Sequence, residues 1–380
     1  MNTGKVCRFG MLAGVIAASP LSASAQSSVT LYGIIDAGVT YVTNDGGSHN
    51  IKMDDGVLVP NRWGLKGKED LGGGLAAIFQ LENGFSVLNG KLNQGGALFG
   101  RQAYVGLSGG FGKVTLGRQY DFTHDYLSPF NVGGWDASGY GIHQGDFDRE
   151  GGDRMNNAIK YTSPNFSGFS FGGMYSFSNQ AGNFHDGSGW SVGASYEHGP
   201  LKLVGAYTYV ATPSLDPYGA IGVSTFLGQT VATHGANGVA TDLFGDGSFA
   251  LRSLATLGLG AQYQIGPVAL LANFTDTKLK GTGVTEGQSS TMRVYEVGST
   301  WQINPAWSAA GSYQHTTFES HNWNEVSLGL DYALSKRTTL YGAVDGLMAS
   351  SGVDPVIGYS FAPALSNKQA IVRLAMVHTF

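Results

Sequence analysis

The stretch GFSFGGMYSFS at residues 168–178 alternates between two kinds of side chain. Phe169, Phe171, Tyr175 and Phe177 share one face of an extended strand, and most of the residues between them are Ser or Gly. Successive side chains of a strand point to opposite faces, so this pattern predicts a strand with one apolar and one polar face. Such a strand separates an apolar medium from an aqueous one.

The same two-residue period recurs along the chain and predicts about sixteen strands. Many of them are roughly 9 to 12 residues long, which is the length that a tilted strand needs to cross a bilayer. Strands of ordinary globular proteins average about 5 or 6 residues. The predicted strands cover 28–42, 58–68, 75–85, 98–108, 111–119, 154–162, 168–178, 190–198, 200–210, 255–265, 267–277, 291–302, 306–317, 323–333, 337–347 and 369–380.

The composition agrees with sheets that face an apolar medium. The chain has 59 Gly, 20 Phe and 18 Tyr, and only 13% of its residues are charged. After the amino-terminal segment no stretch approaches the ~18 consecutive apolar residues of a transmembrane helix. Basic residues are nowhere concentrated enough to indicate nucleic-acid binding. We therefore expect no helical membrane span and no nucleic-acid partner.

The amino terminus has the features of a secretory signal peptide. Lys5 and Arg8 precede the apolar run FGMLAGVIAASPL, and small residues follow near Ala23-Ser24-Ala25. We expect residues 1–25 to be cleaved, which leaves 26–380 as a single domain. Cleavage removes Cys7, the only cysteine, and two of the 22 basic residues, so the mature charge is 20 − 27 = −7.

Lipid offers no hydrogen-bond partners, so an open sheet edge inside a membrane would leave backbone groups unpaired. Closure into a barrel removes both edges, and a barrel of about sixteen strands is too wide for side chains to fill. The sequence thus predicts an all-β, 16-stranded antiparallel transmembrane barrel around water. Short connections should lie at one rim and the long insertions 120–153, 211–254 and 348–367 at the other. Phe380 should face outward in an aromatic girdle at the lipid interface.

Several segments, taken together and in order, resemble the Gram-negative general diffusion porins, most closely those of the beta-proteobacterial type. The resemblance covers nearly the whole mature chain. The segments are SSVTLYGIIDAGV, NRWGLKGKEDLGGGLAAIFQLENGF, LFGRQAYVGLSGGFGKVTLGRQYD, NNAIKYTSPNFSGFSF and the terminal His378-Thr379-Phe380.

The resemblance implies a homotrimer in the outer membrane of a Gram-negative bacterium, in contact with membrane lipid and lipopolysaccharide. Ions and small hydrophilic solutes would diffuse passively through each barrel. The third long loop, here about 120–153, would fold into the lumen and narrow it. Phe380 would also be recognised by the periplasmic barrel assembly machinery.

The resemblance further implies basic residues on the wall that face acidic residues on the inserted loop, with a field across the gap. Arg62, Arg101 and Arg154 match the arginine cluster of the family, and Lys66 and Lys160 are additional candidates. Strand parity also turns Arg62 and Arg154 inward, whereas the inward placement of Arg101 depends on the resemblance alone. The alternative for each arginine is a structural charge, or a rim charge bound to carboxylates or lipopolysaccharide.

Two other arginines lie outside this cluster. Arg118 shares parity with apolar residues, which favours an interface or a loop anchor, and Arg373 is inward by parity on the last strand.

The acidic partners are harder to place. After Pro129 the loop lacks the glutamate of the enterobacterial pattern, so the loop has one carboxylate fewer to face the arginines. We therefore expect the channel to prefer anions despite the negative net charge of the chain. The candidates are Asp121, Asp125 and Asp136 on the loop and Glu82 on the wall, with Asp146, Asp148 and Glu150 as further loop acids.

Sequence patterns that are typical of other functions are weaker. Two G-x-S-x-G strings, at 168–172 and 189–193, lie within predicted strands with no helix after them, so they do not indicate a nucleophile elbow or an enzyme. No histidine pair has a compact ligand spacing, so no metal site or cofactor is predicted, and calcium on the acidic outer loops stays unassigned. Two alternatives remain open: a porin that prefers one substrate through an internal site, and an adhesin-like barrel whose long loops bind other surfaces.

Overall fold

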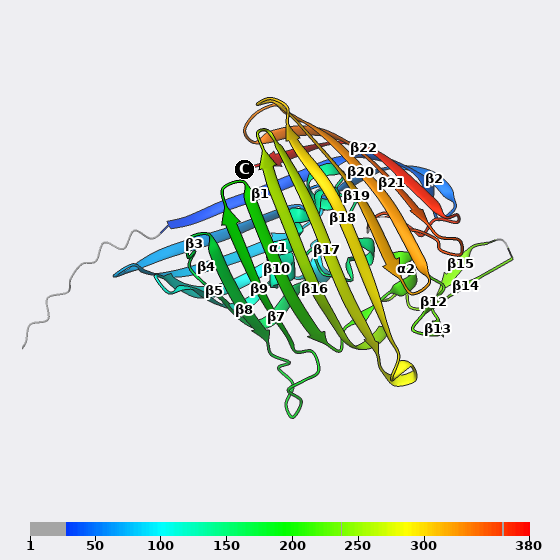
Figure 1. The fold of residues 1–380 in the computed structure, drawn as a ribbon, viewed down its shortest axis with the longest axis horizontal. Coiled ribbons are helices and arrows are strands. Elements are labelled where there is room, and N and C mark those ends of the chain that lie inside the picture. Colours follow the sequence, from blue (N-terminus) through cyan, green and yellow to red (C-terminus); the bar gives the residue numbers. More distant parts are fainter. Residues whose placement is uncertain (1–27, 237, 359–360) are drawn as a thin grey trace, which may run out of the picture.

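A computed structural model describes residues 28–236, 238–358 and 361–380 (Figure 1). The predicted signal peptide, residues 1–25, lies outside the described residues. None of the helices in the described ranges is long and apolar enough to span a membrane.

One continuous antiparallel wall contains most of the described chain (Figure 1). Its 18 strands occupy 18 − 2 = 16 positions, because β2 and β3 both pair with the same side of β1 and β11 continues β10 along β16. The strands are β1 (Ser28–Asp45), β2 (Ser48–Asp55), β3 (Arg62–Gly72), β4 (Leu75–Gly84), β5 (Gln102–Gly109), β6 (Gly112–Tyr120), β7 (Arg154–Thr162), β8 (Phe169–Ser176), β9 (Gly189–His198), β10 (Leu201–Ala211), β11 (Ser214–Leu215), β16 (Phe249–Ile265), β17 (Val268–Gly281), β18 (Ser289–Gln302), β19 (Trp307–Phe318), β20 (His321–Ala333), β21 (Thr338–Ala349) and β22 (Lys368–Thr379).

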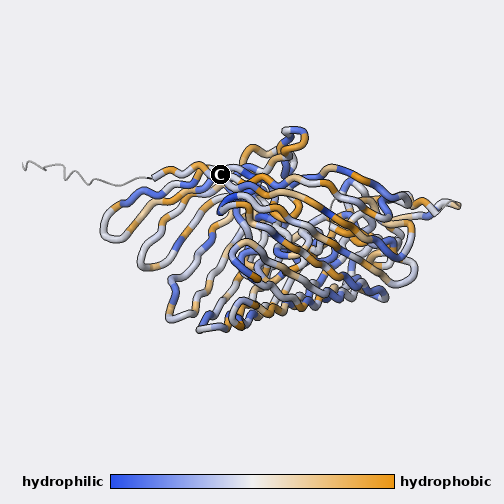
Figure 2. The backbone as a smooth tube through the Cα atoms, turned by 90° about the horizontal axis from the view of Figure 1, so that it is seen from above, coloured by the Kyte–Doolittle hydropathy of each residue, from blue (hydrophilic) through white to orange (hydrophobic). Residues whose placement is uncertain are grey.

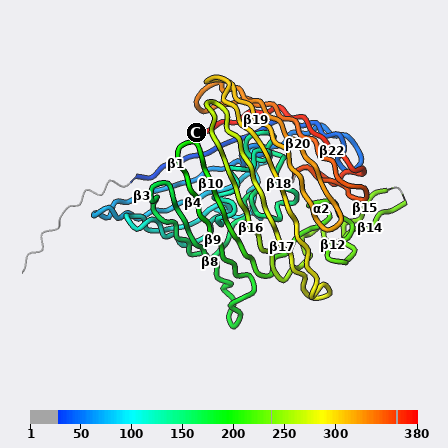
Figure 3. The backbone as a smooth tube through the Cα atoms, in the orientation of Figure 1, coloured from blue at the N-terminus to red at the C-terminus, as the bar shows by residue number. Residues whose placement is uncertain are grey.

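The last strand pairs with the first and closes the barrel. β22 runs antiparallel to β1 from the Ile34–Thr379 pair to the Val42–Ile371 pair, and Figure 3 shows the red last strand next to the blue first strand. The predicted 16-stranded antiparallel barrel is confirmed.

The wall beside β1 differs from the prediction, which had one strand there, at residues 58–68. It holds two strands, β2 and β3, separated by residues 56–61. There the Asp36 carboxylate accepts the backbone N–H groups of Leu58 (2.7 Å) and Val59 (3.2 Å), and Asn61 Oδ1 accepts the N–H of Asp36 (2.6 Å). Side chains thus replace the ladder hydrogen bonds where the strand is interrupted.

The outward face of the barrel is apolar. On β22 the large apolar side chains that are exposed are Val372, Leu374 and Met376, and Figure 2 shows hydrophobic and hydrophilic residues alternating along the strands. Phe380 is also outward, and its backbone exchanges hydrogen bonds with Gly33 (3.0 and 3.1 Å). Its ring covers Gly33, where a Cβ would lie 2.2 Å from the ring. The role of Phe380 in assembly stays a prediction.

The insertion at residues 121–153, here called the inserted loop, folds inside the wall (Figure 1). It contains α1 (Phe122–Leu127), η2 (Ser128–Phe130), η3 (Gly133–Ala137) and η4 (Gln144–Asp146). Phe122, Leu127 and Phe130 are fully buried against apolar residues of the inner wall. The hydrophobic effect therefore draws this loop into the lumen rather than over the rim.

Glycines on the inner wall leave room for the inserted loop. A Cβ on Gly298 would lie 2.7 Å from Val132 Cβ, and one on Gly329 would lie 2.1 Å from the backbone oxygen of Ala137. No side chain fits at such distances, so the close approach requires glycine. The other inner-wall glycines covered by the loop are Gly172, Gly193, Gly258 and Gly260.

The other long insertions also pack together at the same rim. The segment 212–248 forms α2 (Pro217–Ile221), β12 (Thr225–Phe226), β13 (Gln229–Thr230), β14 (Ala232–His234) and β15 (Ala240–Asp242). Its buried Phe226 joins Ile357 of the last long loop and Phe147 of the inserted loop in one apolar cluster. The remaining short elements are η1 (Gln94–Gly96) and η5 (Gly283–Thr285).

Candidate functional site

Arginines from separate wall positions gather around Tyr120, the last residue of β6. Arg101 Nη2 donates to the Tyr120 hydroxyl at 2.8 Å and Arg154 Nη2 at 2.5 Å. The Arg154 guanidinium also lies 4.5 Å from the centre of the Tyr120 ring. Arg62, the first residue of β3, has Arg101 and Glu82 among its charged neighbours. The structure therefore brings together the three arginines predicted from the sequence.

Strand parity does not hold at Arg101. It lies in a bend just before β5, so the alternation of the strand does not apply to it. Its side chain is buried, and Nε donates to Glu82 Oε1 at 2.8 Å. Glu82 therefore lies among the arginines and not across the lumen from them. The three arginines and Glu82 together carry a net charge of 3 − 1 = +2.

Arg118 points to the outer side of the wall and binds segments that flank the site. Its Nε donates to the backbone oxygen of Gly100 (2.8 Å) and its Nη1 to Asn156 Oδ1 (2.7 Å).

Lysines continue the basic wall toward the rim with the short turns. Lys66 on β3 is exposed, with Nζ 5.3 Å from the centre of the Tyr32 ring. Lys160 on β7 donates to the Tyr120 backbone oxygen at 2.8 Å and pairs with Asp125. Lys113 on β6 lies near Lys160 and was not predicted, although it shares parity with Thr115 and Gly117.

The structure corrects the predicted place of Asp121 at the gap. This residue is fully buried, because its carboxylate caps α1 by accepting the His124 N–H (3.1 Å) and also accepts Arg149 Nε (2.8 Å). Asp125 is bound to Lys160 beside the wall. Asp136 lies across the lumen near Asp331 and Glu296. Burial, followed by the repulsion of these two acids, raises the pKa of Asp136 to about 6.

Asp148 and Glu150 of the loop lie instead in a buried acid cluster with His143 and with Glu296 of β18. His143 Nδ1 lies 2.5 Å from Asp148 Oδ2, and His143 Nε2 lies 3.2 Å from Glu296 Oε2. Glu150 Oε2 accepts a hydrogen bond from Asn273 at 2.7 Å. All four members of the cluster are buried.

The protonation of the acid cluster follows from its burial. Burial raises the pKa of Glu150 well above its usual value. Burial alone would lower the pKa of His143, but the charges of Asp148 and Glu150 raise it well above the usual value. Burial opposes ionisation of Asp148, yet the charge of His143 leaves the pKa of Asp148 lowered. The raised pKa of His143 favours its cationic form beside the Asp148 carboxylate, and the raised pKa of Glu150 favours its protonated form.

His143, Asp148 and Glu150 also bring three potential metal-ligand atoms within 4.8 Å of one another. Imidazole and carboxylate groups are metal ligands in many proteins. The spacing of these residues along the chain did not indicate such a set.

Two more carboxylates on the wall hold the inserted loop. Gln144 Nε2 donates to Glu325 Oε2 on β20, and Ser138 Oγ donates to Asp345 Oδ2 on β21, both at 2.7 Å. Sequence analysis missed both acids, because parity shows only that they face inward and not what they contact.

Arg373 on β22 is likewise fully buried, pairing with Asp36 (3.1 Å) and with Asp54. These contacts make it a structural residue.

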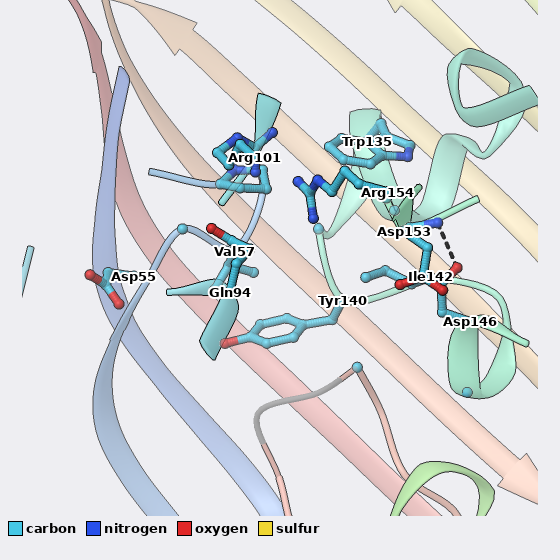
Figure 4. A pocket seen from close by; sticks show the side chains of 18 residues that line it. Asp55, Val57, Gln94, Arg101, Trp135, Tyr140, Ile142, Asp146, Asp153 and Arg154 are labelled. Atoms are coloured by element: carbon cyan, nitrogen blue, oxygen red, sulfur yellow. Dashed lines mark hydrogen bonds between the residues drawn. The ribbon is translucent and has the colours of Figure 1, made fainter. Parts of the chain in front are cut away.

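A cavity of about 420 Å³ separates the arginines from the inserted loop. Figure 4 shows the Arg154 side chain between those of Arg101 and Trp135, with Asp146 and Asp153 further along the lining. Arg154 Nε and the indole Nε1 of Trp135 are buried donors without a hydrogen-bond partner among the described residues. The lining can therefore offer hydrogen bonds and positive charge to a passing anion.

Residues 12–348 match the model of the Gram-negative porin family. The chain belongs to this family. Porins are non-enzymatic channels of the outer membrane, so the short turns of this porin face the periplasm and the long loops face outward.

Porins of known sequence and structure resemble most of the chain. An outer membrane porin protein of Bordetella pertussis is 33% identical over 87% of this chain and 91% of its own length. Outer membrane porin protein 32 of Delftia acidovorans is 31% identical over 97% and 99%. The solved anion-selective porin from Comamonas acidovorans superposes with a TM-score of 0.73 at 27% identity, covering 93% of this chain and all of the other. OmpT of Vibrio cholerae in its trimer form has a TM-score of 0.66 at 14% identity over 93% and 99%, and shares the fold.

Proposed function

We propose that this porin is an anion-preferring channel for the passive diffusion of ions and small hydrophilic solutes. The observation that carries the proposal is the unequal exposure of charge around the cavity. Arg101 and Arg154 line the cavity beside Tyr120, whereas Asp148 and Glu150 of the inserted loop are buried behind it. The acids of the same lining are engaged by donors of the protein: Asp153 pairs with Arg149, Asp55 accepts from Asn61 and from the Val87 N–H, and Asp146 accepts from the Gly151 N–H. In a narrow gap with low-dielectric walls, the charges that face the water determine the field that an ion meets.

The comparison with the Comamonas acidovorans protein supports this proposal, because that structure is described as an anion-selective porin. The negative net charge of the chain is no obstacle. Acids outside the narrow region act through bulk water, where salt screens them over about 8 to 10 Å.

Reversal potentials in a potassium chloride gradient across a planar bilayer test the proposal. We expect a potential that corresponds to a higher permeability for chloride than for potassium. A potential of the opposite sign would reject the anion preference while leaving the channel intact.

A second candidate function is a preference for carboxylate-bearing solutes at an internal site. It is favoured by the unpartnered donors Arg154 Nε and Trp135 Nε1, since buried donors without partners gain from a ligand that accepts from them. Addition of succinate should then reduce the chloride current at millimolar concentration, and acetamide, which has no charge, should not. Equal effects of the two solutes would refute a carboxylate site.

We further propose that the protein has no enzymatic activity and assembles as a homotrimer, as OmpT of Vibrio cholerae does in its trimer form. The serines of the two G-x-S-x-G strings bond to other hydroxyls: Ser170 Oγ lies 2.8 Å from Ser195 Oγ, and Ser191 Oγ lies 2.8 Å from Thr208 Oγ1. No described histidine bonds to either serine. The mass of the detergent-solubilised protein tests the trimer, and ester hydrolysis by purified protein would contradict the absence of activity.

A further inference from the structure

Tyr120, the last residue of β6, has a hydroxyl group that two arginines share. Arg101 Nη2 donates to its oxygen at 2.8 Å and Arg154 Nη2 at 2.5 Å. The two arginines reach it from separate parts of the wall, because Arg101 precedes β5 and Arg154 begins β7. A phenol oxygen has two lone pairs, so both of its acceptor positions are taken by cations.

The shared acceptor determines how closely the two guanidinium groups can lie. Arg101 is among the charged neighbours of Arg154, and like charges repel each other. An oxygen that accepts from both groups offsets part of this repulsion, since hydrogen bonds from charged donors are stronger than those between neutral groups. Without that oxygen the two guanidinium groups should move apart.

Arg154 depends on Tyr120 more than Arg101 does. Arg101 Nε also pairs with Glu82 Oε1 at 2.8 Å. Among the residues that the structure describes, Tyr120 is the only hydrogen-bond partner of the Arg154 side chain, whose Nε is unpartnered. The Arg154 guanidinium also lies 4.5 Å from the centre of the Tyr120 ring, where a cation and an aromatic ring attract each other. This one tyrosine therefore largely sets the position of Arg154.

Tyr120 itself is held by the inserted loop and by the wall. It is buried, and its ring stacks on that of His124 of α1, with 3.9 Å between the ring centres and 23° between the ring planes. His124 Nδ1 in turn lies 2.8 Å from the backbone oxygen of Glu150. The backbone oxygen of Tyr120 accepts Lys160 Nζ at 2.8 Å. A tyrosine that is fixed at its ring and at its backbone can hold a long, flexible arginine side chain in one place.

We propose that Tyr120 is the positioning residue for anion preference, because its hydroxyl keeps the Arg154 guanidinium at the cavity through which ions pass. Arg154 is among the described residues that line the cavity and Tyr120 is not. Tyr120 thus acts through Arg154 and does not touch the permeating ion. The ring alone would suffice for packing against His124, so the hydroxyl group is what the proposal concerns. The inference rests on the proposed anion preference of the channel.

Removal of the hydroxyl group tests the proposal. Tyr120→Phe keeps the ring and its contacts with His124 and Arg154 but loses the acceptor. We expect the chloride-to-potassium permeability ratio, measured from reversal potentials, to fall roughly threefold, because Arg154 loses its hydrogen bond and spreads over more orientations. Tyr104→Phe is the matched control, since Tyr104 is a wall tyrosine on β5 whose hydroxyl bonds to Gln80 (2.9 Å), and it should keep the wild-type ratio. A loss of the same size in both variants would overturn the proposal.

A double-mutant cycle separates positioning from packing. In an Arg154→Gln background, Tyr120→Phe should change the permeability ratio by less than about 1.5-fold, because the residue through which Tyr120 acts is gone and Arg101 keeps its pair with Glu82. A tyrosine that only packs would lower the ratio by the same factor in both backgrounds, and that result would refute the proposal.

The wild-type reversal potential separates this inference from the proposed function. A wild type that prefers cations overturns the proposed function and this inference with it. A wild type that prefers anions, with an unchanged permeability ratio in Tyr120→Phe, overturns the role of Tyr120 alone.

A second variant covers the case in which Tyr120→Phe forms no channels. Arg154→Lys keeps the positive charge, but its ammonium group lacks the planar fork with which the guanidinium both stacks on the Tyr120 ring and donates to the hydroxyl. The permeability ratio should fall at least about twofold. A wild-type ratio in folded Arg154→Lys would show that the contacts with Tyr120 do not matter for anion preference.

Discussion

The two sides of the inserted loop differ more in hydration than in charge. Toward β5–β7 the loop borders a cavity with Arg101 and Arg154 in its lining. Toward β18–β21 it is pressed against the wall, where the acid cluster, Glu325 and Asp345 are buried. Charge therefore acts on permeating ions on one side, whereas on the other side it holds the loop in place.

Burial explains the difference. A carboxylate that leaves water loses its hydration and must gain hydrogen bonds, a cation or a proton. Glu150 accepts a hydrogen bond from Asn273 and has a raised pKa, which favours the protonated acid, and Asp148 pairs with His143, whose pKa is also raised. Arg154 is only partly buried and lines the cavity, so its charge acts on the water there. A count of charges along the loop is thus a poor guide to the charge inside the channel.

Reversing one charge on the cavity side should have the strongest effect on transport. In the Arg154→Glu variant two units of charge change next to the ion path. At about 6 Å and the dielectric constant of water each unit is worth about 0.7 kcal/mol, so the chloride-to-potassium permeability ratio should fall at least about tenfold. Reversal potentials measure the ratio. Lys368→Glu, an outward change, should leave it unaltered, and an unaltered ratio in Arg154→Glu would show that the cavity is not the selective region.

On the buried side, pH should act through Glu150 and His143. Both pKa values are raised in the folded protein, so their contributions to stability are fully present below the unfolded pKa values and are lost as pH rises through the folded ones. The free energy of unfolding should therefore decrease as the pH is raised into the alkaline range.

Glu150→Gln keeps the hydrogen bond from Asn273 without a titratable group. It should flatten the alkaline decline and stabilise the protein by about 1 kcal/mol where Glu150 ionises in the wild type. Urea unfolding of detergent-solubilised protein at a series of pH values measures this. Glu286→Gln, at an exposed pair, should behave as wild type, and an unchanged pH profile in Glu150→Gln would count against a neutral Glu150.

A side chain at a wall glycine that the inserted loop covers should displace the loop without changing any charged residue. In Gly329→Leu the new side chain meets the backbone of Ala137, which cannot rotate away, so the loop must shift from the wall. We expect about a twofold increase in single-channel conductance with weaker ion preference. Gly346→Leu is the matched control, since a Cβ there meets nothing within 4 Å. Wild-type conductance in folded Gly329→Leu would mean that the loop does not limit the current.

A smaller change is expected from Asp136, whose pKa is about 6. The raised pKa means that this acid loses its charge as pH falls from 7.5 to 5, so the lumen loses a negative charge and the preference for anions should increase by roughly 1.5-fold. Asp136→Asn should show the higher preference at both pH values. A decrease of anion preference on acidification would contradict this role.

Local patterns predicted more of the wall than of the loop. Alternation located almost every strand, but it did not find the break between β2 and β3, where the Asp36 carboxylate accepts hydrogen bonds from the backbone N–H groups of Leu58 and Val59. Parity placed Arg62 and Arg154 correctly and failed for Arg101, which precedes its strand. The family resemblance corrected that failure. Asp121 was assigned to the gap because nothing local indicates that it caps α1 and binds Arg149.

The amino-acid sequence alone determined the closed sixteen-strand wall and its two solvents, because a period of two residues is a local property and every polar backbone group in lipid must be paired. Only the tertiary structure decided which charges face the channel. The inserted loop has no regular period, and each of its acids is hydrated or buried according to contacts with wall residues far away in the sequence, such as Asn273, Glu296 and Asp345.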